Sequence, residues 1–148
     1  MSVFNHVGHC VTDLDRSRRF YVEALGFEPW REITLPDDGT AQLLRLTPPV
    51  GLTACYLRMD GFVLELLHYS GSGAAPLPAP DRVMNEPGLT HISVSVDDID
   101  ATCRRVVELG GRVVEETNIG MAVNVKDPDG QLIELLPMSY AERIAAEG

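Results

Sequence analysis

Four residues with metal-binding side chains occupy repeated positions in the two halves of the chain. His6 and His91 each begin an alternating apolar run, and Glu65 and Glu134 each precede a Leu-Leu pair in the segments DGFVLELL and DGQLIELL. Because alternate side chains of a strand share a face, each glutamate lies between aliphatic neighbours. A carboxylate buried there is costly unless another charge compensates it. Two imidazoles and two carboxylates therefore predict one divalent metal, with zinc, nickel, cobalt, manganese and iron all compatible with the donors.

Each of these residue types has a structural explanation when it occurs alone. A single strand histidine is more often hydrogen-bonded within the fold, and a single strand glutamate usually faces solvent at a sheet edge. The repetition of both types at equivalent positions favours the metal site. His9 is excluded as a ligand unless the strand bulges, because alternation turns it to the face opposite His6. Cys10 shares the face of His6 and is interpreted as a small inner-wall residue near the substrate, with a ligand role as the alternative.

The repeat predicts two βαβββ modules, each with a helix between its first and second strands. Asp13 and Asp98 are natural helix caps, and Gly26 and Gly110 end the helices that follow. The Asp60-Gly61 pair predicts a hairpin turn. Strands are predicted at residues 3–11, 27–35, 40–47, 53–59 and 62–69 in the first half, and at 89–96, 112–117, 119–126 and 131–137 in the second.

These elements predict an α+β fold in a single domain that covers residues 1–148. Module one is assigned to residues 1–69 and module two to residues 89–138. Residues 70–88 are rich in Gly, Ser and Pro and predict a connecting loop. Its role is left open between a lid and a simple connection with no function of its own. A capping box at Ser139 predicts a short C-terminal helix over residues 139–148.

The composition excludes several classes of partner. The chain of 148 residues has a formal net charge of −10, which opposes nonspecific binding to nucleic acid and to anionic membranes. No apolar run approaches the roughly 20 residues that span a bilayer, and the N-terminus shows no signal-peptide pattern. Three unevenly spaced cysteines argue against a disulfide framework. We expect a cytoplasmic protein that acts on a small molecule.

The chain resembles the vicinal oxygen chelate superfamily, which includes glyoxalase I, methylmalonyl-CoA epimerase, extradiol dioxygenases, and fosfomycin and bleomycin resistance proteins. The resemblance is carried by HVGHCVTDLDRSRRFYVEALGFE, FVLELL, GLTHISVSVDDID and VKDPDGQLIELL, which span nearly the whole chain. It implies two tandem βαβββ modules that form a curled mixed sheet around one metal. It assigns the ligands to His6, Glu65, His91 and Glu134. It also implies a homodimer, with the site built either within one chain or across two.

The two histidines and two glutamates resemble bacterial glyoxalase I and its epimerase relatives. That resemblance implies a lyase or isomerase that moves a proton next to a metal-chelated carbonyl through an enediolate-like intermediate. It makes Glu134 the first candidate base and Glu65 the second. Glyoxalase I usually has Arg four residues after its first ligand and Asn four residues after its second, where this chain has Cys10 and Tyr69.

These departures weaken the expectation of glutathione as a thiol cofactor. A substitute anion anchor is Arg58, with a solvated strand arginine as the alternative interpretation. If the Asp60-Gly61 hairpin has a two-residue turn, Arg58 and Tyr56 lie on the face of Glu65 and join Cys10 in binding substrate.

Two other functions stay open at this stage. An iron(II) extradiol dioxygenase prefers two histidines and one carboxylate, so the second glutamate disfavours it. A drug-sequestering protein of the bleomycin resistance type often lacks the ligands, whereas this chain retains all four.

Overall fold

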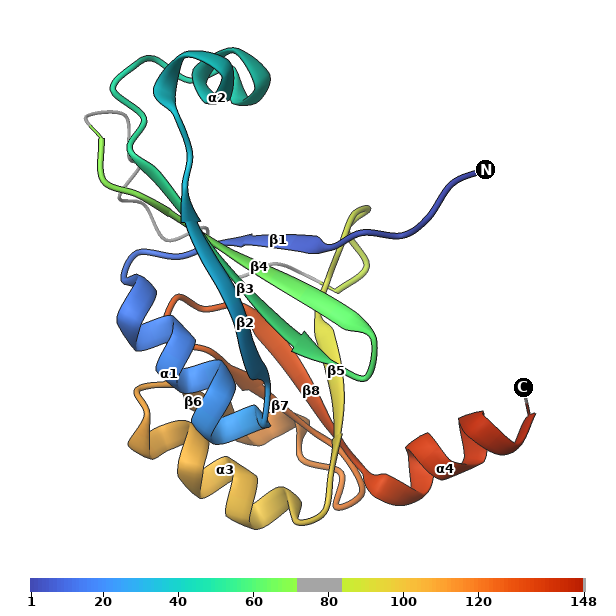
Figure 1. Ribbon diagram of the computed structural model, residues 1–148. Coiled ribbons are helices and arrows are strands. Elements are labelled where there is room, and N and C mark those ends of the chain that lie inside the picture. Colours follow the sequence, from blue (N-terminus) through green and yellow to red (C-terminus); the bar gives the residue numbers. More distant parts are fainter. Residues whose placement is uncertain (72–83, 148) are drawn as a thin grey trace. The chain divides into compact units, whose positions relative to one another are not determined.

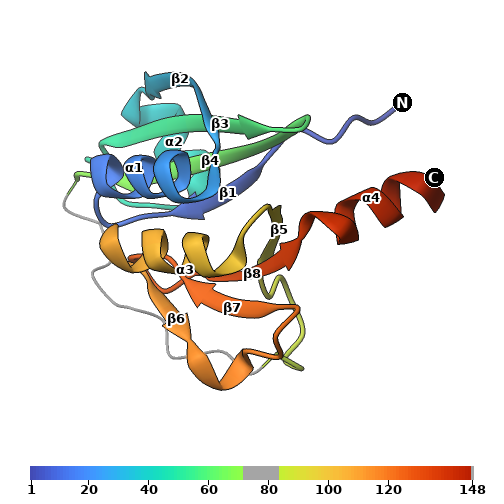
Figure 2. The ribbon, with the colours of Figure 1, turned by 90° about the horizontal axis from the view of Figure 1, so that it is seen from below.

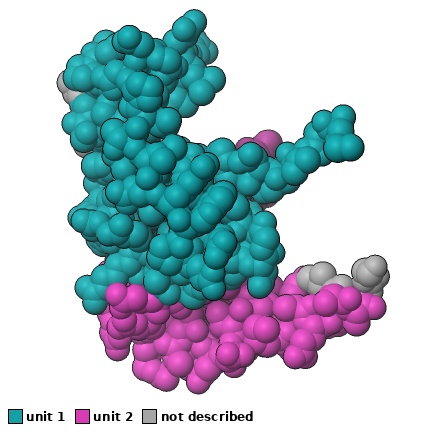
Figure 3. All heavy atoms as spheres, in the orientation of Figure 1, with its two compact units in different colours: residues 1–22, 26–77 teal, residues 23–25, 78–148 magenta. Residues whose placement is uncertain are grey.

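The computed structural model describes residues 1–71 and 84–147, and most of the predicted connecting loop 70–88 lies outside the described residues. The chain divides into two compact units. Unit 1 comprises Met1–Val22 and Gly26–Leu77, and unit 2 comprises Glu23–Leu25 and Pro78–Gly148 (Figure 3). Whether the two units make the predicted single domain stays a prediction, and each unit is described by itself.

Unit 1 contains a four-stranded mixed sheet in the order β1-β4-β3-β2 (Figure 1). β1 runs parallel to β4, and the other neighbours are antiparallel. The elements are β1 (Val7–Cys10), α1 (Leu14–Leu25), β2 (Glu28–Thr34), α2 (Asp37–Leu44), β3 (Leu52–Met59) and β4 (Phe62–Tyr69).

Unit 2 contains a second four-stranded sheet with the equivalent order β5-β8-β7-β6, and α3 lies along it (Figure 2). The elements are β5 (Ile92–Val96), α3 (Ile99–Glu108), β6 (Arg112–Val114), the 3-10 helix η1 (Glu115–Thr117), β7 (Val123–Lys126), β8 (Leu132–Pro137) and α4 (Met138–Glu147). The predicted α+β class with two tandem βαβββ modules is confirmed, and each module forms its own sheet.

The helix boundaries follow from short-range chemistry that the sequence predicts. The Asp13 carboxylate accepts a hydrogen bond from the backbone N–H of Arg16 at 3.0 Å, and the Asp98 carboxylate accepts one from the N–H of Ala101 at 2.8 Å. Each bond satisfies a donor that the first helical turn leaves without a partner. Gly26 ends α1 with φ of 81°, a conformation that glycine adopts without strain.

The predicted strand at 40–47 is wrong, because residues 40–44 belong to α2 and residues 45–47 follow its C-terminal end. Pro36 precedes the helix, and Asp37 and Asp38 stand in its first turn, where carboxylates interact favourably with the helix dipole. The Asp37 carboxylate also accepts hydrogen bonds from the backbone N–H groups of Val50 and Gly51. Ala41 is buried against Val50, so tertiary packing overrides the alternating pattern.

Several predicted strands are shorter in the structure. β1 covers Val7–Cys10 rather than 3–11, and β5 covers Ile92–Val96 rather than 89–96, so His6 and His91 each lie one residue before a strand. Residues 115–117 form η1 instead of the end of a strand, and β7 begins at Val123 instead of residue 119. α4 begins at Met138, which places Ser139 inside its first turn.

The hairpin between β3 and β4 fixes which side chains of unit 1 share a face. Met59 pairs with Phe62, so Asp60 and Gly61 form the predicted two-residue turn, with φ values of 46° and 78°. This register places Tyr56 directly opposite Glu65 and Arg58 opposite Val63. Tyr56, Arg58 and Glu65 therefore lie on one face, as the turn predicts.

The other face of each sheet forms the core. In unit 1, Leu57, Leu64 and Leu66 are fully buried, as are Phe20 and Tyr21 of α1. In unit 2, fully buried side chains come from α3, β7 and β8, namely Val106, Val125, Ile133 and Leu135. Across the described ranges, no helix is both long and apolar enough to cross a membrane.

We expect Leu66→Ala to lower the free energy of unfolding by about 3 kcal/mol, because it leaves a cavity in a packed core. The matched variant Leu43→Ala removes a leucine that is 81% exposed, so its effect should stay within about 0.5 kcal/mol. Urea denaturation followed by circular dichroism measures both. Equal losses would show that the helix-facing side of this sheet is not the core of unit 1.

Candidate metal centre

A histidine and a glutamate lie in contact on the sheet of unit 1. His6 Nε2 is 2.9 Å from Glu65 Oε2, and the Glu65 residue is 7% exposed. Gly8, two residues after His6, pairs with Glu65 in the parallel register, and a side chain at Gly8 would approach the Glu65 carboxylate. Glycine at this position therefore leaves room beside the carboxylate.

The second nitrogen of His6 makes the pairing with Glu65 informative. His6 Nδ1 lies 2.7 Å from the amide oxygen of Asn5, an acceptor. When Nδ1 donates to Asn5, Nε2 of a neutral ring directs its lone pair toward Glu65. In that tautomer His6 and Glu65 present lone pairs that one metal ion could bind together, whereas in the other tautomer Nε2–H donates to the Glu65 carboxylate.

Unit 2 repeats the pair at equivalent positions. His91 Nε2 is 3.6 Å from Glu134 Oε2, and Thr90 Oγ1 lies 2.8 Å from His91 Nδ1. Ser93, two residues after His91, pairs with Glu134 in the register and donates a hydrogen bond to its carboxylate at 2.8 Å. The Glu134 side chain is 35% exposed against 10% for Glu65. The two pairs thus share a register and differ in how tightly they hold the carboxylate.

The spacing within each pair suits neighbouring ligands of one ion. With bonds of about 2.1 Å, adjacent ligands lie roughly 3.0 Å apart in octahedral and 3.4 Å apart in tetrahedral geometry. The observed separations are 2.9 and 3.6 Å. Among residues 1–71 and 84–147, no three His, Cys, Asp or Glu side chains form one metal-binding group. The predicted ligands therefore come as two pairs, one in each unit.

Tyr56 lies beside the unit 1 pair. Its ring meets the His6 ring edge-on with centroids 6.0 Å apart, and it pairs with Glu65 in the register of the sheet. Burial raises the pKa of Tyr56, and the interaction with the Glu65 carboxylate raises it further. The hydroxyl therefore stays protonated. That Tyr56 binds substrate stays a prediction.

The Arg58 guanidinium forms an ion pair with Glu28. Its Nε and one terminal nitrogen each lie 3.3 Å from Glu28 Oε2. Arg58 lines a pocket of about 520 Å³ together with Trp30 and Val63. Its predicted role as anion anchor is untested, and the ion pair with Glu28 reduces the charge it offers to a ligand.

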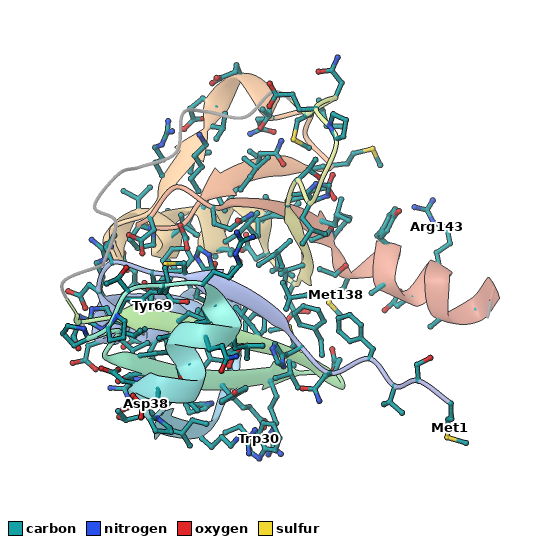
Figure 4. The ribbon with its side chains drawn as sticks, turned by 90° about the horizontal axis from the view of Figure 1, so that it is seen from above. Met1, Trp30, Asp38, Tyr69, Met138 and Arg143 are labelled. Atoms are coloured by element: carbon teal, nitrogen blue, oxygen red, sulfur yellow. The ribbon has the colours of Figure 1, made fainter. Side chains whose placement is uncertain are left out.

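The other predicted side chains also fall on definite faces. Cys10 is exposed and pairs with Leu67 on the face of Glu65, near Tyr69, the last residue of β4 (Figure 4). Its role near substrate stays a prediction. The His9 ring packs edge-on against Tyr21 of α1, with centroids 6.0 Å apart, which agrees with its exclusion as a ligand.

Sequence reasoning missed Trp30 and Arg31 of β2. The register shifts between Pro29 and Arg31, so Trp30 is an extra residue and Arg31 pairs with Tyr56. The Arg31 guanidinium carbon lies 4.4 Å from the Tyr56 ring centroid and 4.8 Å from that of Trp30, which projects from β2 (Figure 4). No sequence signal marks this bulge, because alternation cannot be read through an inserted residue.

Comparison with known proteins gives one family. Residues 3–135 match the model of the Glyoxalase/Bleomycin resistance protein/Dioxygenase superfamily. A probable lactoylglutathione lyase of Synechocystis is 29% identical over 134 residues, covering 87% of this chain and 90% of that protein. An ethylmalonyl-CoA/methylmalonyl-CoA epimerase of Cereibacter sphaeroides is 31% identical over 141 residues, covering 88% of this chain and 94% of the epimerase.

Among solved structures, the trypanothione-dependent glyoxalase I of Leishmania major is similar over most of the chain. The TM-score is 0.67 at 27% identity, and the match covers 96% of this chain and 91% of that one. Both the curated relatives and this structure therefore match the two-module arrangement nearly end to end.

We expect thiol reactivity to report the faces assigned to the cysteines. Cys10 is exposed and should react first with Ellman's reagent, whereas Cys55 is buried. Burial, and then the nearby Glu32, raises the pKa of Cys55, so less of its thiol is ionised than in an exposed cysteine and it reacts more slowly. Cys10→Ser should remove the fast phase of the reaction with Ellman's reagent, followed by stopped-flow absorbance at pH 8. A fast phase that survives in this variant would contradict the assigned faces.

Proposed function

Because the chain belongs to the Glyoxalase/Bleomycin resistance protein/Dioxygenase superfamily, we propose that it is a divalent-metal-dependent lyase, isomerase or epimerase that transfers a proton next to a carbonyl group. The observation that carries this proposal is the repeated His–Glu pair, at 2.9 Å in unit 1 and 3.6 Å in unit 2. Relatives named as lactoylglutathione lyases and acyl-CoA epimerases support the same reaction class.

The proposed metal ligands are His6, Glu65, His91 and Glu134. Their donor set fits zinc, nickel, cobalt, manganese or iron, and each histidine has a polar neighbour at Nδ1 that orients its ring. When bound, such a metal would supply Lewis acidity that polarises the substrate carbonyl. The proposal holds whether the two pairs come from one chain or from two chains of a homodimer.

The proton-transfer role is proposed for Glu134 first and Glu65 second. Glu134 is the more exposed carboxylate, and its contacts are the Ser93 hydroxyl and the more distant His91 ring. Glu65 is buried and held by His6 and Tyr56 together. A base must move toward the substrate proton and return, and the looser setting of Glu134 suits that motion.

The paired carboxylates also separate this proposal from the two alternatives. Iron(II) dioxygenases use two histidines and one carboxylate, which leaves positions open for substrate and oxygen. A drug-sequestering protein requires no base and often lacks the ligand residues, whereas this chain retains His6, Glu65, His91 and Glu134.

The first test is metal content. Protein purified without chelator should contain a divalent metal by inductively coupled plasma mass spectrometry, and His6→Ala or His91→Ala should lose most of it. His9→Ala is the matched control and should retain the metal, because His9 packs on Tyr21. Full metal content in both the His6→Ala and the His91→Ala variants would contradict the assignment of these histidines as ligands.

The second test is proton exchange. Glu134→Gln should slow deuterium uptake from solvent at the α-carbon of an acyl thioester, and slow conversion of methylglyoxal hemithioacetal, by roughly 10²–10⁴-fold. Glu116→Gln makes the same change at an exposed residue of η1 and should keep the full rate. Oxygen consumption on a catechol with iron bound, or drug binding without turnover, would instead favour an alternative function.

A further inference from the structure

Arg31 lies on the same face of unit 1 as Glu65. It pairs with Tyr56, which in turn pairs with Glu65, so the three side chains follow one another across β2, β3 and β4. The extra residue at Trp30 lets two successive side chains reach the Tyr56 ring, since Trp30 meets that ring edge-on at 6.2 Å. Bulges commonly re-aim side chains beside functional sites.

The charge of Arg31 has no acidic partner. The neighbouring acids of its strand are engaged elsewhere, Glu28 with Arg58 and Glu32 with Arg18. Within the described ranges, 1–71 and 84–147, Arg31 forms no ion pair. In a chain whose net charge is −10, a guanidinium that forms no ion pair within the described residues keeps its charge available to a ligand.

The aromatic contacts hold the guanidinium in place. Its carbon lies 4.8 Å from the Trp30 ring centroid and 4.4 Å from the Tyr56 ring centroid. Stacking covers a face of the group and leaves most N–H donors directed around its own plane. Those donors match the two oxygens of a carboxylate.

The anchor lies close to the proposed metal ligands. The Arg31 guanidinium carbon is 4.4 Å and the His6 ring centroid 6.0 Å from the same Tyr56 ring centroid. A compound of a few carbons spans that interval. We infer that Arg31 binds a carboxylate at the far end of a short oxo-dicarboxylate substrate or acyl group, whose carbonyl end lies at the His6–Glu65 pair. This inference rests on the proposed function and specifies its substrate class.

Trp30 provides the measurement, because it is the single tryptophan of the chain. Zinc-supplemented protein is titrated with 2-oxoglutarate and with 2-oxopentanoate, an acid of the same carbon-chain length that lacks the second carboxylate. Quenching of Trp30 fluorescence should give roughly tenfold tighter binding of 2-oxoglutarate, as expected for one charge-assisted hydrogen-bonded pair. Arg31→Gln should abolish this preference, and Arg31→Lys should retain part of it.

The matched control is Arg104→Gln, an exposed arginine of α3, which changes the net charge equally and should keep the preference. Equal affinities for the two acids, no quenching by either, or the same loss in Arg104→Gln would overturn the inference. Displacement of 2-oxoglutarate by inorganic phosphate more readily than by succinate would overturn the carboxylate assignment.

Metal content measured on the same samples separates the two proposals. If the wild-type protein holds metal through its histidines but binds both acids equally, the anchor is wrong and the proposed function stands. If Arg31 confers the preference while the protein binds no metal, the proposed function is wrong and the anchor stands.

Discussion

A carboxylate placed among aliphatic side chains needs a balancing charge, and Glu65 is in that position. The residue is 7% exposed, between strand neighbours that are themselves largely apolar, and it contacts His6 and Tyr56. Removing such a charge from water costs several kcal/mol unless hydrogen bonds and a counter-charge replace the solvent. The register brings Gly8 and Tyr56 to either side of the carboxylate and His6 lies against it, and the balancing charge is the one that the proposed metal ion would supply.

The same register recurs in unit 2 with different side chains. Ser93 replaces Gly8 beside the carboxylate, and Asn124 occupies the position opposite Glu134 that Tyr56 occupies opposite Glu65. One glutamate is consequently buried under an aromatic ring, and the other is more exposed and held by a hydroxyl. A repeated backbone thus supports two carboxylates with different freedom, which is the division that a fixed ligand and a mobile base require.

The arrangement of charge on β2 follows from its irregular register. Glu28 and Glu32 pair with arginines from β3 and α1, so the acids that precede and follow Arg31 do not neutralise it. In a regular strand, successive side chains point to opposite faces. The bulge at Trp30 instead places the Trp30 ring against the Arg31 guanidinium. In this way, an acidic protein can keep the positive charge of an arginine such as Arg31 available to a ligand without a large basic patch.

The sequence alone was sufficient for the two-module α+β fold, because the His and Glu-Leu-Leu landmarks repeat and because helix caps and turns are local. Asp13, Asp98 and the Asp60-Gly61 turn depend on residues a few positions apart, so their structures could be predicted. The turn also fixed the face of Tyr56. Of the four predicted ligands, His6 lies against Glu65 and His91 lies near Glu134, each within its own unit, and their joining at one metal stays a prediction.

Tertiary structure decided what local pattern could not. Residues 40–47 are predicted as a strand, but residues 40–44 fold as part of α2, because Asp37 binds the backbone of a distant segment and Ala41 packs against it. Arg58 stays a predicted anion anchor, and only the pairing of β2 with β3 reveals that Glu28 lies against it. Arg31 gained its place through a bulge that shifts strand register. Such effects depend on which segments pair across the sheet, and alternation within one strand carries no information about the residue that lies opposite.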